Sequence, residues 1–477
     1  METASPSSVS AAGGIYNAGG IYRIGEEKGS KVTLVSTGGA SLDLSDEEID
    51  RLFSDALKRA LAEAKNSGPV IVLPPDITRF HSRAGFLTDI AARELGAVGN
   101  GRADRLGAVM PALGTHMPIT NAEMHRMFPN TPEGKFLVHD WRRDVTTLGR
   151  IEGSFVEKVT EGKVSYDWPV QVNKHLLESD ISLIISIGQV VPHEVIGMAN
   201  HTKNLFVGTG GKEAIDKSHF AGACYGMEKM MGRIDTPVRA LFDEGFRRYE
   251  NSLPPVLFAL TVVGPRSAAE AAKTGKEAGT LAVRGFYAGF GRECFEQAAA
   301  LAREVNVDIM DEPIKKAVVY LEPEEFRTTW LGNKAIYRTR MAMEDDGELL
   351  IMASGLERFG EDLEVDKLIR KYGYRSSAEI LAKVGTEKDI AENLSVAAHL
   401  IHGSSEGRFT VRYCPGPGVS RAEIESVGYQ WGSLEEAQER YDEKKLSLGW
   451  NTLGDGERVF FVPNPALGLW AERKRFG

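Results

Sequence analysis

Three short apolar runs, each followed directly by polar residues, constrain the fold of this chain most strongly. The runs cover residues 70–73, 108–113 and 181–187. Short apolar runs that alternate with helical patterns are typical of buried parallel strands joined by helices. In such sheets ligands bind beyond the carboxyl ends of the strands. Asp76, His116 and His193 all follow these ends, so we expect their side chains to converge.

The patterns predict an α/β protein with two α/β domains and an active-site cleft between them. Helical spacing covers residues 45–64 and 86–95, and the N-terminal domain should hold a largely parallel, Rossmann-like sheet. A second unit begins after Pro265, with its clearest strands at 316–321 and 349–353. The expected boundaries are a flexible arm at 1–20, rich in Ser, Ala and Gly, a catalytic and cofactor-binding domain at 21–265, and a C-terminal domain at 266–477.

Composition excludes several classes of function. The chain has 477 residues, 42% of them hydrophobic and 26% charged, which is ordinary for globular proteins. Its net charge of −10 argues against a general nucleic-acid binder, because phosphate affinity comes from clustered Lys and Arg. No apolar run has the length of a membrane span, and the first residues lack the features of a signal peptide. The three cysteines are widely spaced, so neither a zinc site built from paired cysteines nor a disulfide framework is indicated. We expect a cytoplasmic protein.

Three histidines and one lysine are the candidates for chemistry. His116 ends the segment Ala-Leu-Gly-Thr-His, and His193, Lys203 and His219 follow within one later stretch. Histidine has a pKa near neutrality, which suits proton transfer, so two imidazoles can serve as acid and base. The amine can anchor a carbonyl-type group, and the remaining imidazole can hold a metal.

A glycine-rich segment precedes His219. Gly208-Thr209-Gly210-Gly211-Lys212 looks like a phosphate-binding loop, but Glu213 stands where that loop needs Ser or Thr. The glycines therefore predict a tight turn into a helix that begins near Lys212 and carries His219. The amino end of that helix could still face an anion.

Several separated motifs together resemble the lactate racemase family. They are Asp76-Ile77-Thr78-Arg79, Ala112-Leu113-Gly114-Thr115-His116 and Gly285-Phe286-Tyr287-Ala288-Gly289. Spacing carries most of the likeness: Lys203 lies ten residues after His193, and His219 lies sixteen residues after Lys203, as in the family pattern. Members of this family carry a nickel-pincer nucleotide, a pyridinium thioamide/thiocarboxylate mononucleotide that holds Ni.

The resemblance implies a role for each matching residue. Lys203 would tether the cofactor and His219 would be the protein ligand to nickel, while His116 and His193 would be the acid/base pair. Asp76, Thr78 and Arg79 would hold the cofactor nucleotide or orient the acid/base site, with Arg79 counted among the catalytic residues. Enzymes that mature the cofactor would be the protein partners.

The substrate is the point at which the sequence departs from the family. Ala199-Asn200-His201-Thr202 replaces the usual Ser-Gly-Gly-Arg before the lysine, and the polar pair expected near Tyr337 reads Arg338 with Met341. We expect substrate contacts from Trp330, Lys334, Tyr337 and Arg338. Together with Arg340 and His201, these basic and bulky positions favour an α-hydroxy acid larger than lactate, and the first hypothesis is an aldonate epimerised at C2.

Three functions remain open from the sequence. The first is a racemase or epimerase that inverts the C2 carbinol of an α-hydroxy acid by proton-coupled hydride transfer to the nickel-pincer cofactor. The second is a zinc-dependent hydrolase that uses His116, His193 and His219 as ligands, a role that leaves Lys203 without a function. The third is a nucleotide-binding protein without catalysis, in which the histidines are structural.

Overall fold

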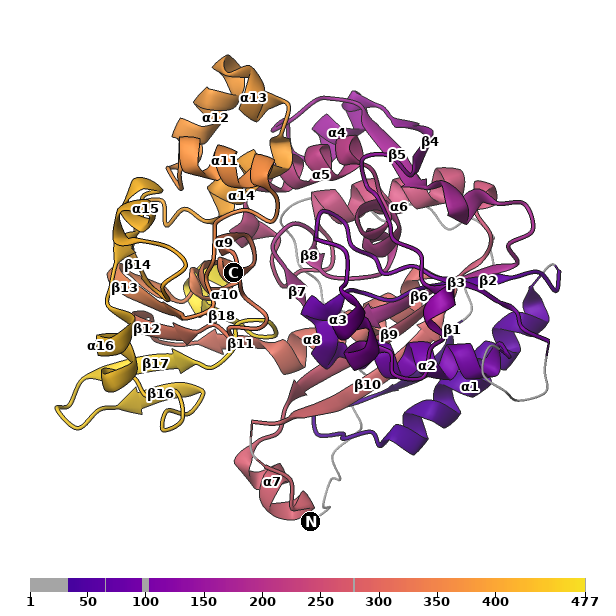
Figure 1. Ribbon diagram of the computed structural model, residues 1–477, viewed down its shortest axis with the longest axis horizontal. Coiled ribbons are helices and arrows are strands. Elements are labelled where there is room, and N and C mark those ends of the chain that lie inside the picture. The colour runs from indigo at the N-terminus through magenta and orange to yellow at the C-terminus, as the bar shows by residue number, and fades with distance from the viewer. Residues whose placement is uncertain (1–32, 65, 97–102, 278, 477) are drawn as a thin grey trace, which may run out of the picture.

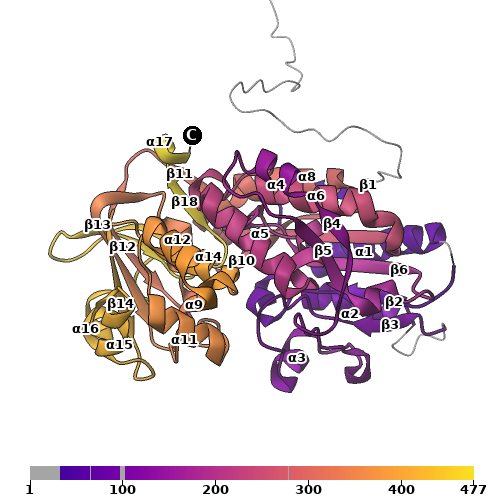
Figure 2. The same cartoon turned by 90° about the horizontal axis from the view of Figure 1, so that it is seen from above.

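The structure, a computed structural model, describes residues 33–64, 66–96, 103–277 and 279–476. The arm expected at 1–20 lies outside the described residues. Two α/β units lie side by side, the first coloured indigo through magenta to salmon-pink and the second mainly orange to yellow in Figures 1 and 2. Among the described residues, no helix has the length and apolar character needed to cross a membrane. The mixed α/β fold with two main sheets confirms the predicted fold class.

Six strands form the sheet of the first unit, in the order β1-β10-β9-β6-β2-β3. The four strands β9, β6, β2 and β3 are parallel, whereas β10 and β1 are added antiparallel at one edge. The predicted runs 70–73 and 181–187 correspond to β2 and β6, whereas the run 108–113 overlaps only the end of β3 and continues into the loop after it. These three strands are neighbours in the parallel part. The strand bounds are β1 Thr33–Gly38, β2 Val70–Leu73, β3 Leu106–Val109, β6 Leu183–Gln189, β9 Val256–Pro265 and β10 Leu281–Gly289.

Helices cover both faces of this sheet because successive side chains of its buried strands point to opposite faces. Val70 and Val72 pack against α1 and α2 on one face, whereas Ile71 and Leu73 belong to the core beneath α5, α6 and α8. The helix bounds are α1 Asp46–Glu63, α2 Ala84–Glu94, α5 Lys212–Tyr225, α6 Pro237–Tyr249 and α8 Arg292–Asn306. Ser45 starts α1 with a capping box, as the helical spacing predicts.

Smaller elements complete the first unit. Its short helices and turns are η1 Ile77–Ser82, α3 Asn121–Met127, η2 Glu133–Lys135, α4 Gly153–Val159, η3 Lys174–Leu177, η4 Asn204–Gly208, η5 Met227–Lys229, η6 Glu250–Ser252 and α7 Ala268–Thr274. Two further antiparallel pairs join β4 Val145–Ile151 with β5 Trp168–Asn173, and β7 Pro192–His193 with β8 Gly197–Met198.

The first unit extends further along the chain than the expected boundary at Pro265. Pro265 is the last residue of β9, and β9 pairs with β10 beyond it. Helix α8 then packs on the same sheet through Phe295. The physical reason is that α7 is an excursion between two paired strands, which protrudes from the body of the unit in Figure 1. It does not begin a new domain.

The second unit is built around another six-stranded sheet, in the order β15-β14-β13-β12-β17-β16. All neighbours are parallel except β16 and β17. Its strands are β12 Ile314–Tyr320, β13 Met343–Ala353, β14 Thr410–Pro415, β15 Gln430–Trp431, β16 Gly449–Thr452 and β17 Arg458–Val462. Its helices are α9 Thr329–Gly332, α10 Lys334–Thr339, α11 Leu363–Tyr372, α12 Ser377–Thr386, α13 Lys388–Ala391, α14 Leu394–His402, α15 Arg421–Ser426 and α16 Leu434–Arg440.

Two packing contacts between the units matter most for the site. Strand β11 (Val307–Met310), which follows α8, pairs in parallel with β18 (Leu469–Glu472), and α17 (Arg473–Phe476) then packs against the first unit. Helix α14 of the second unit lies against α5 of the first, where the Asp216 carboxylate accepts a hydrogen bond from the Ser395 backbone N–H at 3.1 Å. The second contact brings the face of α14 towards the histidine of α5.

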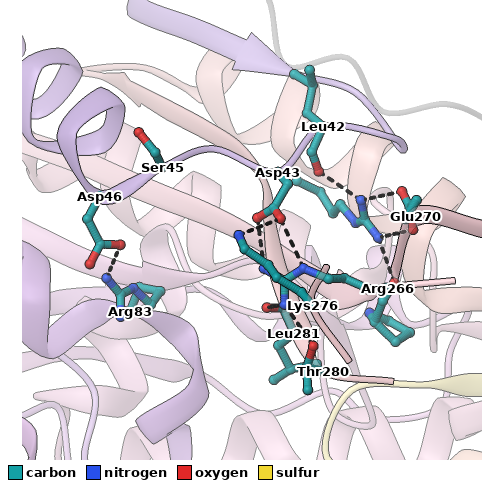
Figure 3. Close-up of polar contacts among 12 residues, drawn as sticks. Leu42, Asp43, Ser45, Asp46, Arg83, Arg266, Glu270, Lys276, Thr280 and Leu281 are labelled. Atoms are coloured by element: carbon teal, nitrogen blue, oxygen red, sulfur yellow. Dashed lines mark hydrogen bonds and ion pairs between the residues drawn. The ribbon is translucent and has the colours of Figure 1, made fainter. Parts of the chain in front are cut away.

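An ion cluster fixes the base of the protruding α7 arm to the loop before α1. Figure 3 shows Asp43 between Arg266 and Lys276, which donate to its carboxylate over 2.8–2.9 Å. Arg284 on β10 donates to Glu270 of α7 and to the carbonyl oxygen of Leu42. Because Arg284 is buried, this part of the cluster is shielded from salt. The arm is therefore tied to the sheet at its base.

Candidate active site

Two connected spaces lie where the units meet. An inner chamber of about 130 Å³ is bounded by the loops after β2, β3 and β6, and by α9, α10 and α14 of the second unit. An outer cleft of about 1070 Å³ lies between the units. Asp76, Thr78, His116 and Leu331 line both, so the chamber opens into the cleft. The carboxyl ends of three neighbouring parallel strands thus meet at one site, as the fold predicts.

Asp76 orients His116. Its Oδ1 accepts hydrogen bonds from the Thr78 backbone N–H (3.1 Å) and hydroxyl (2.6 Å), and its Oδ2 lies 2.5 Å from Nδ1 of His116. Burial alone would raise the pKa of Asp76, but the charge and hydrogen bond of His116, with Thr78, hold that pKa well below its ordinary value. The ionised carboxylate accepts a hydrogen bond from Nδ1–H of His116, which leaves Nε2 as the proton acceptor.

His193 holds its proton on the opposite ring nitrogen. The Val195 backbone N–H donates to Nδ1 of His193 at 3.1 Å, so Nδ1 is an acceptor and the proton is on Nε2. Burial lowers the pKa of His193 well below its ordinary value, with Lys203 and Arg79 adding to the effect. The imidazole is therefore neutral. The two expected acid/base histidines present one acceptor and one donor.

The amine of Lys203 lines the chamber and makes no side-chain hydrogen bond or ion pair to another residue in the part of the chain that the structure describes. Burial, with Arg79 nearby, lowers the pKa of Lys203 to about 8. A substantial fraction of the amine is thus neutral at physiological pH, and a neutral amine is the nucleophilic form. This is the chemistry that a tethering lysine needs.

His219 lies on α5 and also lines the chamber. Its Nδ1 donates to the carbonyl oxygen of Ile215, one turn earlier, at 2.8 Å. Burial lowers the pKa of His219 to about 4, and Lys203 contributes. The ring is therefore neutral with its Nε2 lone pair available, which is the form that binds a metal, and the carbonyl supplies the orienting contact that metal-binding histidines usually have.

The donor set available for a metal is small. Within the described ranges, no group of three or more His, Cys, Asp or Glu side chains is placed to hold a metal ion. The three histidines of the zinc hypothesis do not form such a group. A cofactor that brings its own donors and needs a single imidazole is compatible with this arrangement.

Basic side chains line one side of the chamber. Arg79 donates to the carbonyl oxygen of Ala466 at 3.4 Å, and so contacts the second unit. Lys334 is buried, and burial together with Arg79 lowers the pKa of Lys334 to about 8. Both line the chamber, where they can receive an anion.

The expected substrate residues of the second unit fall into two groups. Trp330 and Tyr337 line the chamber with Lys334, whereas Arg338 lies behind it, fully buried, and donates to the carbonyl oxygen of Ala466 at 3.3 Å. Nε and Nη1 of Arg338 have no hydrogen-bond partner among the described residues. Its charge nevertheless reaches the chamber, because it acts on Glu194.

Arg340 and His201 lie outside the chamber. Arg340 pairs with Glu228 at 2.9 Å and donates to carbonyl oxygens of residues 402 and 404. The His201 ring packs between Phe258 (4.0 Å) and Phe295 (5.2 Å), on backbone with a positive φ of 59°. Both side chains therefore make contacts within the fold and do not face the chamber.

Four chamber residues were missed by sequence reasoning: Gln189, Glu194, His399 and His402. Both ring nitrogens of His399 are hydrogen-bonded: Nδ1 to the Tyr337 hydroxyl and Nε2 to the Tyr374 hydroxyl, at 2.8 Å each. It also stacks on Trp330, with ring centroids 4.4 Å apart. The sequence did hold a signal for the histidines, since their i, i+3 spacing puts them on one face of a helix.

Comparison with known proteins finds a family likeness in the first unit. Residues 40–232 match the family model of the lactate racemase N-terminal domain. This part of the chain is similar to that domain. The match spans Asp76, His116, His193, Lys203 and His219, and it supports the lactate racemase family and a racemase-type isomerase. No curated protein matches the chain by sequence.

Solved structures extend the likeness in fold beyond the lactate racemase N-terminal domain. A Thermotoga maritima protein shares 21% identity with a TM-score of 0.74, over 91% of this chain and 99% of that one. The lactate racemase apoprotein from Thermoanaerobacterium thermosaccharolyticum shares 14% identity with a TM-score of 0.60, over 88% of this chain and 93% of that one. At these identities the two structures establish the common two-unit fold.

Proposed function

We propose that this protein is a racemase or epimerase that inverts the C2 carbinol of an α-hydroxy acid with a nickel-pincer nucleotide. The observation that carries the proposal is the meeting of His116, His193, Lys203 and His219 on one chamber of about 130 Å³. Two imidazoles with opposite tautomers, an amine of lowered pKa and an imidazole with a free Nε2 are the groups that this chemistry needs.

The residues present fit the cofactor. His219 would bind nickel through Nε2, and Lys203 would form the covalent tether through its amine. The adjoining cleft, at about 1070 Å³, is large enough for a mononucleotide. Thr78 donates to Asp76, and Asp76 in turn accepts from His116, which supports an orienting role for this loop. Any contact with the nucleotide would come from the same loop.

When bound, the cofactor supplies the hydride acceptor for the substrate's C2 hydrogen. The chain's own residues manage the proton and the carboxylate. Nε2 of His116 takes the hydroxyl proton of one configuration, and Asp76 stabilises the imidazolium that results. His193, with its proton on Nε2, would donate a hydrogen bond to the substrate oxygen, and it would act as base for the other configuration in the Nδ1-protonated tautomer, which gives up the contact with the Val195 N–H. Arg79 and Lys334 would hold the substrate carboxylate.

The substrate we infer is an aldonate, a sugar acid epimerised at C2. The chamber wall contributed by the second unit carries Tyr337, His399 and His402, so polar groups surround the space left for the substrate's side chain. Lactate has only a methyl group there. Of these groups, Nε2 of His402 has no hydrogen-bond partner among the described residues, which favours a substrate that supplies a hydroxyl there.

The test is a labelled screen of cofactor-loaded protein, produced together with the cofactor-maturation enzymes. Substrates run from lactate to six-carbon aldonates, each carrying deuterium at C2. Inversion with the label retained supports hydride transfer, because a carbanion route through histidine bases would lose deuterium to solvent. Inversion with complete loss of label would refute the mechanism, and no inversion of any α-hydroxy acid would refute the function.

The cofactor assignment has a separate test. Intact-protein mass spectrometry should find the added cofactor mass on the parent and not on Lys203→Ala. Equal adduct on both would contradict the tether. A zinc hydrolase would instead bind zinc, lack a visible absorption band, and be indifferent to Lys203→Ala.

A further inference from the structure

Glu194 is a charged side chain of the chamber for which the mechanism above has no use. It follows His193 directly, and its side chain is 18% exposed. Its Oε2 lies 3.8 Å from Nδ1 of His193, which is too long for a hydrogen bond. The carboxylate makes no hydrogen bond to another residue in the described ranges, although it lines the chamber.

The charges around Glu194 keep it ionised. Burial alone would raise the pKa of Glu194, but His193, Arg338 and Lys334 together hold it well below its ordinary value. The backbone N–H of Glu194 itself helps to lower this pKa, but no other residue in the described ranges supplies a donor to the carboxylate. A largely buried carboxylate with lone pairs left unfilled favours a ligand with donor groups there.

His402 provides a second unused polar group. It is 3% exposed, lines the chamber, and has no hydrogen-bond partner for Nε2 within the described part of the chain. Burial lowers the pKa of His402 to about 3, so the ring is neutral and can donate through one nitrogen and accept through the other. Three residues earlier on the same helix, His399 has both nitrogens bound to tyrosine hydroxyls.

We propose that Glu194 and His402 form a specificity subsite that binds hydroxyl groups on the substrate's side chain. The inference rests on the proposed function and assigns residues to the recognition of its substrate class. Glu194 belongs to the first unit and His402 to the second, so the subsite is complete only where α14 meets α5.

The subsite sorts α-hydroxy acids by the chemistry of their side chains. A polyhydroxy side chain supplies donors to Glu194 and both donors and acceptors to His402. A substrate with an alkyl side chain leaves Glu194 and His402 without hydrogen-bond partners. Sites built to bind hydroxyls discriminate strongly against such substrates. A second carboxylate would face the negative charge of Glu194, so dicarboxylates such as malate are excluded by repulsion.

The experiment compares Glu194→Gln and His402→Phe with the parent. His139→Phe is the matched control, because it makes the same change at a buried ring outside the chamber whose nitrogens are already bonded to the carbonyl oxygen of Gly210 and the side chain of Asn173. Calorimetric titration of the cofactor-free protein with gluconate, lactate and malate gives the binding preference. The ratio of kcat/KM for gluconate and lactate in cofactor-loaded protein gives the catalytic preference, and Tm reports on folding.

We expect the parent to prefer gluconate, and each test variant to lose about tenfold or more of that preference. Glu194→Gln should also begin to bind malate. His139→Phe should lower Tm while leaving the gluconate-to-lactate ratio within about twofold, because it removes two buried hydrogen bonds that lie outside the chamber. If His402→Phe fails to fold, Glu194→Gln decides alone.

Two results would overturn the subsite: a parent that binds gluconate no better than lactate, or a ratio that moves less than about twofold in both test variants. The proposed function fails in a different way. If the loaded parent inverts no α-hydroxy acid while gluconate still binds the cofactor-free protein through Glu194 and His402, the subsite stands and the reaction is wrong.

Discussion

The substitution Asp76→Asn tests whether the carboxylate sets the tautomer of His116. Oδ1 of Asp76 accepts from two donors of Thr78, one of which is a backbone N–H that can only donate. An asparagine must therefore keep its carbonyl oxygen on that side and turn its NH₂ group towards Nδ1 of His116. Two donors cannot share one hydrogen bond, so the imidazole proton moves to Nε2. His116 then lacks the lone pair that accepts the substrate's proton.

The expected loss in turnover follows from the removal of His116 as a positioned base. A positioned acid or base contributes about 10²–10⁴-fold, and a histidine held in the wrong tautomer costs about 10⁴-fold in hydrolytic triads. We therefore expect turnover to fall by about 10²–10⁴-fold in Asp76→Asn, with cofactor retention unchanged. Asp89→Asn is the matched control: Asp89 is a buried carboxylate that accepts from Thr131 at 2.6 Å, away from the chamber.

The assay has two parts. Inversion rates measure the chemistry, and ¹⁵N NMR of histidine-labelled, cofactor-free protein measures which ring nitrogen of His116 is protonated. The parent should show the proton on Nδ1, and Asp76→Asn should show it on Nε2. An unchanged tautomer with less than about tenfold loss would refute the reasoning. An equal loss in Asp89→Asn would attribute the effect to folding.

Three further predictions concern buried titrating groups. Because the pKa of Lys203 is lowered to about 8, acylation of this lysine in cofactor-free protein should rise with a midpoint near pH 8, as peptide mass spectrometry would show, and a midpoint near 10 would contradict its burial. His219→Ala should lose nickel while the organic part of the cofactor remains on Lys203, and unchanged nickel after desalting would exclude His219 as the ligand. His219 and His402 have folded-state pKa values of about 4 and about 3, below the ordinary 6.5, so their stabilising contribution is complete above pH 6.5 and is lost as pH falls towards those values. The free energy of unfolding measured in urea should therefore fall by about 1.4 kcal/mol per pH unit for each histidine in this range. His402→Gln should remove the contribution of one histidine from that slope.

The sequence predicted the parallel core because local patterns determine it. The apolar runs lie in β2, in β6 and at the end of β3, and their ends brought Asp76, His116 and His193 together. The helix that carries His219 begins at Lys212, as the glycine turn predicts. The boundary at Pro265 failed because a helical excursion between two antiparallel strands looks, in sequence, like the start of a domain.

What the sequence could not predict depends on contacts between distant segments. Glu194 and His402 line the same chamber only when α14 packs on α5, and no local sequence pattern predicts that packing. His201 was misinterpreted for a related reason. Its basic character favoured substrate binding, but a left-handed backbone turn directs the ring between two phenylalanines.

The pairing of β11 with β18 has a consequence for biosynthesis. A ribosome releases β11 together with the finished first sheet long before β18 emerges, so the first unit can fold while one edge of β11 still lacks its partner. During that interval His219 and Lys203 are already in place, but the chamber has no second wall. Nascent chains therefore pass through a stage in which the chamber is open to solvent, and the late strand ends that stage by joining the two units.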